Sequence, residues 1–317
     1  MAGRDVRRLA ARASEVTHQA KRDAVSRIAA GADAAGIERL LVHDEPFRIS
    51  TGAVESMELG ARVEVVERSG LSNGEADTAD AVAAMREAGV DVLVVLGGDG
   101  TSRCVARQWS DAPLVPVSTG TNNVFPRMVE PTLAGAAAGL VASGRVALDE
   151  VARPAKVVRI RAPEAEDAIA LVDAVLLRDD FVGNRMPFDP ARIDRILLTV
   201  ADPASVGISP IGGLVEPVSR EDDAGLLVRC NTGAEDRIVH VPISPGLYRD
   251  VRVGAADRID AGVTVLFEGP GVIAMDGDRE IRLDTGTTAR LTVDRTGPRV
   301  LDVQATLAAA ARDRLFG

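Results

Sequence analysis

A short glycine-rich turn at the end of an apolar run is the feature that most constrains this chain. Residues 91–96 (DVLVVL) are mostly branched and apolar, a pattern typical of a strand buried on both faces, and residues 97–100 (GGDG) follow directly. Three glycines around one carboxylate let the backbone turn sharply and approach a ligand closely. A helix capped by Thr101 or Ser102 is expected next, so the stretch predicts a strand–turn–helix unit whose N–H groups favour bound phosphate.

Asp99 places a negative charge where a phosphate group would sit. That position is unfavourable unless the carboxylate faces a metal ion or takes a proton from an acceptor hydroxyl. The alternative is a tight turn with a solvated aspartate, and the motif taken alone leaves both interpretations open. We therefore treat Asp99 as a candidate catalytic or metal-linked carboxylate.

A second polar loop follows the next predicted strand. Residues 114–117 are a short apolar strand, and residues 118–123 (STGTNN) supply many small donors. Ordinary turn chemistry would also use these residue types. However, parallel strands present their carboxyl ends on one edge of a sheet, where ligands bind, so two such loops are expected to share a crevice. The candidate nucleotide- or phosphate-binding residues are Gly97, Gly98, Gly100, Thr101, Ser118, Thr119, Gly120, Thr121, Asn122 and Asn123.

These motifs resemble the superfamily of NAD kinases, diacylglycerol kinases and sphingosine kinases. The fuller text, LGGDGTSRCVA, PLVPVSTGTNNVFP and EPTLAGAAAGL, is most similar to the ATP-NAD kinase-like proteins of the AcoX (acetoin-catabolism X) group. Asp99 matches the aspartate of the superfamily's first motif, and Gly120, Thr121 and Asn122 match its second. The second loop departs from the usual NAD kinase form and is nearer to the lipid-kinase form.

The resemblance implies a kinase that uses ATP, or another phosphoryl donor, with Mg²⁺. It also implies a β-sandwich after the α/β domain, with the site in the cleft between them. Lipid kinases of the superfamily carry Asp-Gly-Glu where this chain has Asp276, Gly277 and Asp278. The three residues therefore become a possible contribution from the second domain, although Asp-Gly is equally a strong signal for a plain hairpin turn.

The order of predicted elements supports a two-domain fold. Strands and helices alternate up to about residue 146, which predicts a doubly wound, mostly parallel sheet. Short β-rich runs then follow one another, as in a β-sandwich. We expect an α/β nucleotide-binding domain at 1–146, a β-sandwich domain at 147–296, and a C-terminal segment at 297–317. By resemblance, the helix in that last segment returns to pack on the first domain.

Composition excludes several classes of protein. The net charge of −10 predicts no general surface for nucleic acid or anionic lipid, and two cysteines and three histidines form no disulfide framework or metal motif. Lys21 and Lys156 are the only lysines, so phosphate must be held by backbone N–H groups, arginine and metal. No apolar leader or membrane-span pattern is visible. We expect a cytoplasmic protein with small nucleotide substrates, no nucleic-acid partner and no membrane span, and a homo-oligomer is left open.

Three functions are compatible with this pattern. The first choice is an NAD kinase-like phosphotransferase, whose product would belong to NADP biosynthesis. The second is a lipid or small-hydroxy-compound kinase of the diacylglycerol kinase-like type, which the low aromatic content of 3% weakly disfavours. The third is a nucleotide-binding regulator that transfers nothing, and the presence of Asp99 argues against it.

Overall fold

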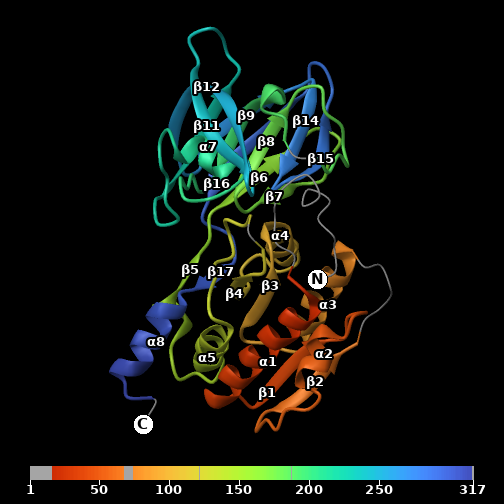
Figure 1. Ribbon diagram of the computed structural model, residues 1–317, viewed down its shortest axis with the longest axis vertical. Coiled ribbons are helices and arrows are strands. Elements are labelled where there is room, and N and C mark those ends of the chain that lie inside the picture. Colours follow the sequence, from red (N-terminus) through yellow and green to blue (C-terminus); the bar gives the residue numbers. More distant parts are fainter. Residues whose placement is uncertain (1–15, 68–73, 121, 187, 316–317) are drawn as a thin grey trace.

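The computed structural model describes residues 16–67, 74–120, 122–186 and 188–315. They form an α/β region and a β-rich region, stacked one on the other (Figure 1). The expected fold class is confirmed: a mixed parallel α/β region precedes an antiparallel, sheet-rich region, and a C-terminal helix is present.

Two small sheets make up the strand layer of the α/β region. In the first, β1 (Arg39–His43) and β2 (Arg62–Val66) are parallel. The second has the order β3-β4-β17-β5, and β3 runs parallel to β4. Its strands are β3 (Leu93–Gly97), β4 (Pro113–Ser118), β17 (Arg299–Leu301) and β5 (Ala152–Pro154). Parallel neighbours need a crossover connection, which for β3 and β4 is helix α4 (Asp99–Gln108).

The other helices of this region are α1 (His18–Ala34), α2 (Ile49–Val54), α3 (Glu75–Glu87), α5 (Pro131–Ala142) and α6 (Leu148–Val151). Helices α1 and α5 touch through glycine. A Cβ atom added at Gly135 would lie 2.0 Å from the carbonyl oxygen of Ile28, and one added at Gly31 would lie 2.1 Å from that of Thr132. The small residues of α5 thus bring it against α1 as well as the sheet.

The β-rich region consists of two antiparallel sheets. The seven-stranded sheet has the order β11-β12-β10-β9-β8-β14-β15, and the four-stranded sheet has the order β13-β16-β6-β7. Apolar side chains of both sheets form the core between them, among them Leu176, Leu197, Phe267, Ile273 and Leu291. The elements are β6 (Val157–Arg161), β7 (Ala168–Ala170), β8 (Asp173–Leu177), η2 (Pro190–Arg192), β9 (Ile193–Leu198), α7 (Ser209–Gly213), β10 (Ala224–Cys230), β11 (Arg237–Ser244), β12 (Leu247–Asp260), β13 (Thr264–Glu268), β14 (Gly271–Met275), β15 (Asp278–Leu283) and β16 (Thr288–Asp294).

Some strand boundaries differ from the sequence pattern. The apolar run 258–267 is not one strand, because the chain turns between β12 and β13, where Gly262 has a φ of +83°. The first part of β12 was not expected, since its outward-facing residues are charged. The glycines and small residues of segment 205–213 (SVGISPIGG) favour turns, but the segment includes the short helix α7.

The end of the chain returns to the α/β region. Strand β17 adds to the edge of β4 in parallel, with Val300 opposite Leu114, and pairs with β5 on its other side. Helix α8 (Val303–Arg312) then buries Ala309 and Ala310 in the same apolar cluster as Ala138 of α5. No helix within the described ranges has the length and apolar character needed to cross a membrane.

Candidate active site

The GGDGT stretch joins β3 to α4. Strand β3 ends at Gly97, Gly98 is the N-cap residue, and the helix begins at Asp99. The cap is therefore not Thr101 or Ser102 as the sequence suggested. Gly98 has extended backbone angles and supplies no capping side chain, so the N–H groups of the first turn remain donors for an anion. A carboxylate in this first turn is favourable because it faces the positive end of the helix dipole.

The two predicted loops lie side by side. Gly97 pairs with Ser118 at the ends of β3 and β4, and the N–H of Thr119 donates to the carbonyl of Gly97 at 3.3 Å. The amide of Asn123 donates to the hydroxyl of Ser118 at 2.9 Å. A Cβ atom added at Gly98 would lie 2.6 Å from Oδ1 of Asn123, so close approach is what requires glycine there.

The remaining residues of the second loop are placed differently. Ser118 Oγ donates to the carbonyl of Gly120 at 3.0 Å, which folds the loop back on the strand end. Asn122 faces the β-rich region, where its Oδ1 would lie 3.2 Å from a Cβ atom added at Gly207. That oxygen is buried and has no hydrogen-bond partner among the described residues. Thr121 lies outside the described residues.

Asp99 holds the second loop against the first. Its Oδ1 accepts from the N–H of Val124 at 3.1 Å and of Phe125 at 2.8 Å. The guanidinium of Arg220, from the β-rich region, donates to the carbonyl oxygens of the same two residues. Asp99 is therefore not a solvated turn carboxylate. Burial and the nearby charge of Asp276 raise its pKa from 3.8 to about 7, although the two N–H donors and Arg220 act in the opposite direction.

Asp276 and Gly277 form the hairpin turn between β14 and β15. Their φ angles are +48° and +95°, as a type I′ turn requires. The hairpin signal in the sequence is confirmed, but the carboxylate of Asp276 also has partners. It accepts from the N–H groups of Leu171, Val172 and Asp173 at 2.8 to 3.2 Å. Burial raises the pKa of Asp276, against the charge of Arg103 and these three donors.

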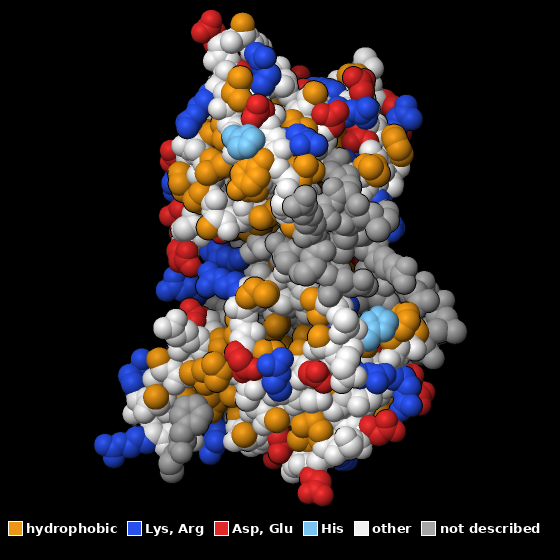
Figure 2. Space-filling view, viewed as in Figure 1, with side chains coloured by type: hydrophobic (Ala, Val, Ile, Leu, Met, Phe, Trp, Pro, Cys, Tyr) orange, Lys and Arg blue, Asp and Glu red, His pale blue; other side chains and the backbone are white. Residues whose placement is uncertain are grey.

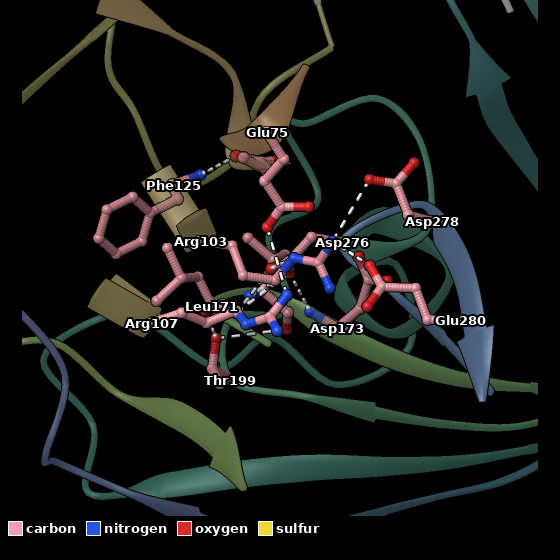
Figure 3. Close-up of polar contacts among 12 residues, drawn as sticks. Glu75, Arg103, Arg107, Phe125, Leu171, Asp173, Thr199, Asp276, Asp278 and Glu280 are labelled. Carbon is pink, nitrogen blue, oxygen red and sulfur yellow. Dashed lines mark hydrogen bonds and ion pairs between the residues drawn. The ribbon is translucent and has the colours of Figure 1, made fainter. Parts of the chain in front are cut away.

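Arg103 connects the two regions. It lies one turn after Asp99 in α4 and is only 2% exposed. Its Nε lies 3.7 Å from Asp276, and its Nη2 lies 3.4 Å from Asp278 and also pairs with Glu280 (Figure 3). Its Nη1 is buried with no hydrogen-bond partner in the described part of the chain. One guanidinium thus binds three carboxylates of the β14–β15 hairpin to the helix that begins with Asp99.

Asp278 and Glu280 remain accessible at the rim of this cluster. Their side chains are 47% and 33% exposed, whereas that of Asp276 is fully buried. A Cβ atom added at Gly100 would lie 3.5 Å from Oδ2 of Asp278. The hairpin therefore reaches the glycine loop at 97–100, which gives the predicted contribution of the β-rich region a geometric basis.

Sequence reasoning missed Arg103, Arg220 and Glu280. Arginine carries nearly all the positive charge of this chain, so neither arginine stood out from its neighbours. Glu280 gave a weak signal, because it follows the Asp-Gly-Asp turn on the same face of β15 as Asp278. The packing of the hairpin against α4 distinguishes Arg103 and Glu280, whereas Arg220 is distinguished by its bonds to the carbonyl oxygens of Val124 and Phe125.

The carboxylates of this site fit Mg²⁺ only when the ion is bound together with the phosphates of ATP. Within the described ranges, no group of three or more His, Cys, Asp or Glu side chains is arranged to hold a metal ion. Mg²⁺ commonly keeps several waters and is held by one or two carboxylates together with substrate phosphates. Asp278 and Glu280 are accessible carboxylates that could meet this requirement, and the N–H groups in the first turn of α4 could hold the phosphates.

Comparison with known proteins gives two family matches. Residues 3–146 match the ATP-NAD kinase N-terminal domain, and residues 156–296 match the acetoin catabolism protein X C-terminal domain. The chain is 32% identical to acetoin catabolism protein X of Cupriavidus necator, over 100% of this chain and 91% of that protein. The chain belongs to the acetoin catabolism protein X family.

The likeness to solved structures supports the fold of this family member. The structure of yeast NADH kinase complexed with NADH superposes with a TM-score of 0.54 at 13% identity, covering 94% of this chain and 84% of that one. An NAD kinase from Archaeoglobus fulgidus in complex with ATP gives a TM-score of 0.43 at 16% identity, covering 89% of this chain and 100% of that one. The superposition on the yeast NADH kinase confirms the expected NAD kinase fold.

Gly98→Val should weaken ATP binding by about tenfold or more, or ~1.4 kcal/mol. The added side chain would displace Asn123, whose Oδ1 lies 2.6 Å from the position of the new Cβ atom, and so separate the two loops. Isothermal titration with Mg²⁺ and ATP measures the effect. Gly233→Val is the matched control, because nothing lies within 4 Å of a Cβ atom added there. If Gly98→Val and Gly233→Val both bind ATP with the affinity of the wild type, the two loops are turns without a binding role.

The raised pKa of Asp99 predicts a pH dependence of stability. Below the unfolded pKa of 3.8 both states carry the proton, and between 3.8 and about 7 only the folded chain keeps it. The contribution of Asp99 is thus fully present at low pH and is lost as pH rises through about 7. Urea unfolding at several pH values should show the wild type losing stability relative to Asp99→Asn over this range. A pH-independent difference would contradict the raised pKa.

Proposed function

We propose that this protein is a kinase that transfers a phosphoryl group from ATP to a hydroxyl acceptor, with NAD as first choice. The proposal rests on the family membership and on one observation in particular. Asp99 combines a place at the amino end of α4, beside two glycine loops, with a pKa of about 7. A carboxylate with that pKa can accept a proton near neutral pH, whereas an ordinary aspartate is a weaker base.

The site residues then have separate roles. N–H groups in the first turn of α4 and the loop at 118–123 hold the phosphates. The acceptor oxygen forms a bond to the terminal phosphorus, the bond from that phosphorus to the bridging oxygen of ADP breaks, and the acceptor proton passes to Asp99. Mg²⁺, when bound with the nucleotide, would neutralise phosphate charge beside Asp278 and Glu280. Arg103 binds both carboxylates and keeps that of Asp278 next to Gly100.

One observation favours the regulator as a second candidate. The Asp99 carboxylate already accepts N–H groups from Val124 and Phe125, so it has a structural task as well. A carboxylate has about four acceptor positions, which leaves room for a substrate hydroxyl. A protein that used Asp99 only for the loop would bind nucleotide and transfer nothing.

A panel of acceptors tests the proposal. NAD, NADH, diacylglycerol and small keto-alcohols are each incubated with ATP and Mg²⁺ while release of ADP is followed. Release that depends on NAD supports the first choice, and release that depends on diacylglycerol or a keto-alcohol supports the lipid or small-hydroxy-compound alternative. Tight ATP binding without release for any acceptor would support the regulator.

A further inference from the structure

A cavity of about 680 Å³ lies inside the α/β region, next to the first phosphate loop but separate from the cluster around Arg103. Its size is within the range of small-ligand sites. Helix α1 lines one side with Val25 and Ile28, and α3 lines another with Val82 and Met85. These helices cover opposite faces of the strand layer, because Leu96 packs with Val25 whereas Leu93 packs with Val82. The cavity is therefore a slot within the strand layer, with apolar side chains on both faces.

The edges of β1 and β3 form the other two walls. Residues from both strands line the cavity, yet β1 pairs only with β2 and β3 only with β4 among the described residues. The edge of each strand that faces the slot therefore presents N–H and C=O groups without a neighbouring strand. Most residues of the two edges are only partly buried, and their backbone groups need a hydrogen-bond partner, which water or a ligand in the slot can supply. A flat ring would suit both kinds of wall. Donors and acceptors on its edge would bond to the strand edges, and its apolar faces would pack against the helices.

The lining is polar near the carboxyl ends of β1 and β3. His43, Glu45, Asp77, Thr78 and Thr101 belong to it, and Thr101 lies in the first turn of α4. A ligand with phosphates on that turn can thus direct its attached group into the slot. In Figure 1, α1, α3 and β3 lie in the α/β region, below the β-rich region.

We propose that the slot between β1 and β3 binds the purine base of the nucleotide whose phosphates lie at the first turn of α4. The apolar side chains of α1 and α3 stack against the two faces of the base, and the strand edges bond to its rim. This inference rests on the proposed function for the place of the phosphates. It goes further because it assigns base recognition to the α/β region alone.

Filling the slot tests the proposal. Ala29 lines it from α1, whereas its neighbour Ala30 is exposed on the same helix and does not. Ala29→Leu should weaken binding of ATP, with Mg²⁺, by at least about tenfold, or ~1.4 kcal/mol, and leave binding of inorganic tripolyphosphate unchanged. Ala30→Leu is the matched control and should leave both affinities unchanged. Ala81→Leu fills the slot from α3 and repeats the test should Ala29→Leu not fold.

The outcomes separate this inference from the proposed function. Wild-type ATP affinity in Ala29→Leu or Ala81→Leu would overturn the base site, and so would equal loss of ATP and tripolyphosphate binding, which indicates general damage. An unmodified chain that binds tripolyphosphate as tightly as ATP would also overturn it. Selective loss of ATP binding in a protein that releases no ADP with any acceptor would support the base site while rejecting the kinase.

Discussion

The Asp99→Asn variant is expected to lose about 100-fold or more of any phosphoryl-transfer activity, the low end of the cost of losing a general base. Asparagine cannot take the acceptor proton or attract Mg²⁺. It can still hold the loop, because Oδ1 of Asp99 accepts from both Val124 and Phe125, at 3.1 and 2.8 Å, and only the second bond of Val124, to Oδ2 at 3.1 Å, is lost. Affinity for ATP without metal should stay the same or rise, since a negative charge beside the phosphates is removed. Steady-state kinetics and titration calorimetry measure the two effects.

Asp99→Ala is the companion variant. It distinguishes the effect of the negative charge from the effect of the hydrogen bonds that hold the second loop. It leaves the N–H groups of Val124 and Phe125 without their acceptor, at about 1–3 kcal/mol for each buried group. We therefore expect Ala to lower both stability and ATP affinity, whereas Asn lowers turnover alone. Wild-type turnover in Asp99→Asn would show that Asp99 only positions the loop. Asp278 and Glu280 would then be the carboxylates to test for proton transfer.

Arg103→Met is expected to lower the free energy of unfolding by about 3–5 kcal/mol, the usual cost of removing one partner of a buried ion pair. Methionine keeps much of the side-chain volume, but it leaves the buried carboxylate of Asp276 without the guanidinium that lies 3.7 Å away. It also frees Asp278 and Glu280 from α4. Urea unfolding followed by circular dichroism gives the change in stability.

Arg107→Met is the matched control, one turn further along the same helix. Arg107 is 44% exposed and pairs with Glu75 at 3.3 Å, so its loss should cost under about 1 kcal/mol. Adding Asp276→Asn to Arg103→Met should recover part of the lost stability, because the uncompensated buried charge is then removed. Similar losses for Arg103→Met and Arg107→Met would contradict the buried network between the two regions.

The face shown in Figure 2 carries side chains of all kinds. Apolar, acidic and basic side chains occur over both regions, and several basic ones lie together at the left, between the two regions. The net charge of −10 disfavours nucleic acid as a partner. Small-molecule nucleotides remain the proposed substrates.

Local patterns were sufficient for some elements of the α/β region. The run RLLVH predicts a strand at 39–43, the observed bounds of β1, and the run before GGDGT predicts β3 because branched apolar residues favour a buried strand. The adjacency of the two loops also followed from the sequence, since parallel strands bring their carboxyl ends to one edge. The Asp276–Gly277 turn was equally readable, because both residues tolerate positive φ.

Contacts between residues far apart in the sequence could not be predicted in this way. The pairing of β17 with β4 joins residues near 300 to residues near 114, and no local pattern specifies a partner strand. The separation of β1 from β3, which creates the slot, likewise depends on how the helices pack. Exposed charges along β12 hid its first residues, because tertiary context overrides local propensity in sheets.

The same distinction between local sequence and tertiary structure applies to the chemistry of the site. Residue types, spacing and the family resemblance made Asp99, the glycines beside it and the second loop candidates, because a phosphate-binding turn needs small residues and free N–H groups in consecutive positions. Folding decided which groups surround that carboxylate. Val124, Phe125, Arg220 and Asp276 reach Asp99 from separate parts of the chain, and burial among them raises its pKa to about 7. Burial and through-space charge depend on distance in three dimensions, which the order of residues does not contain.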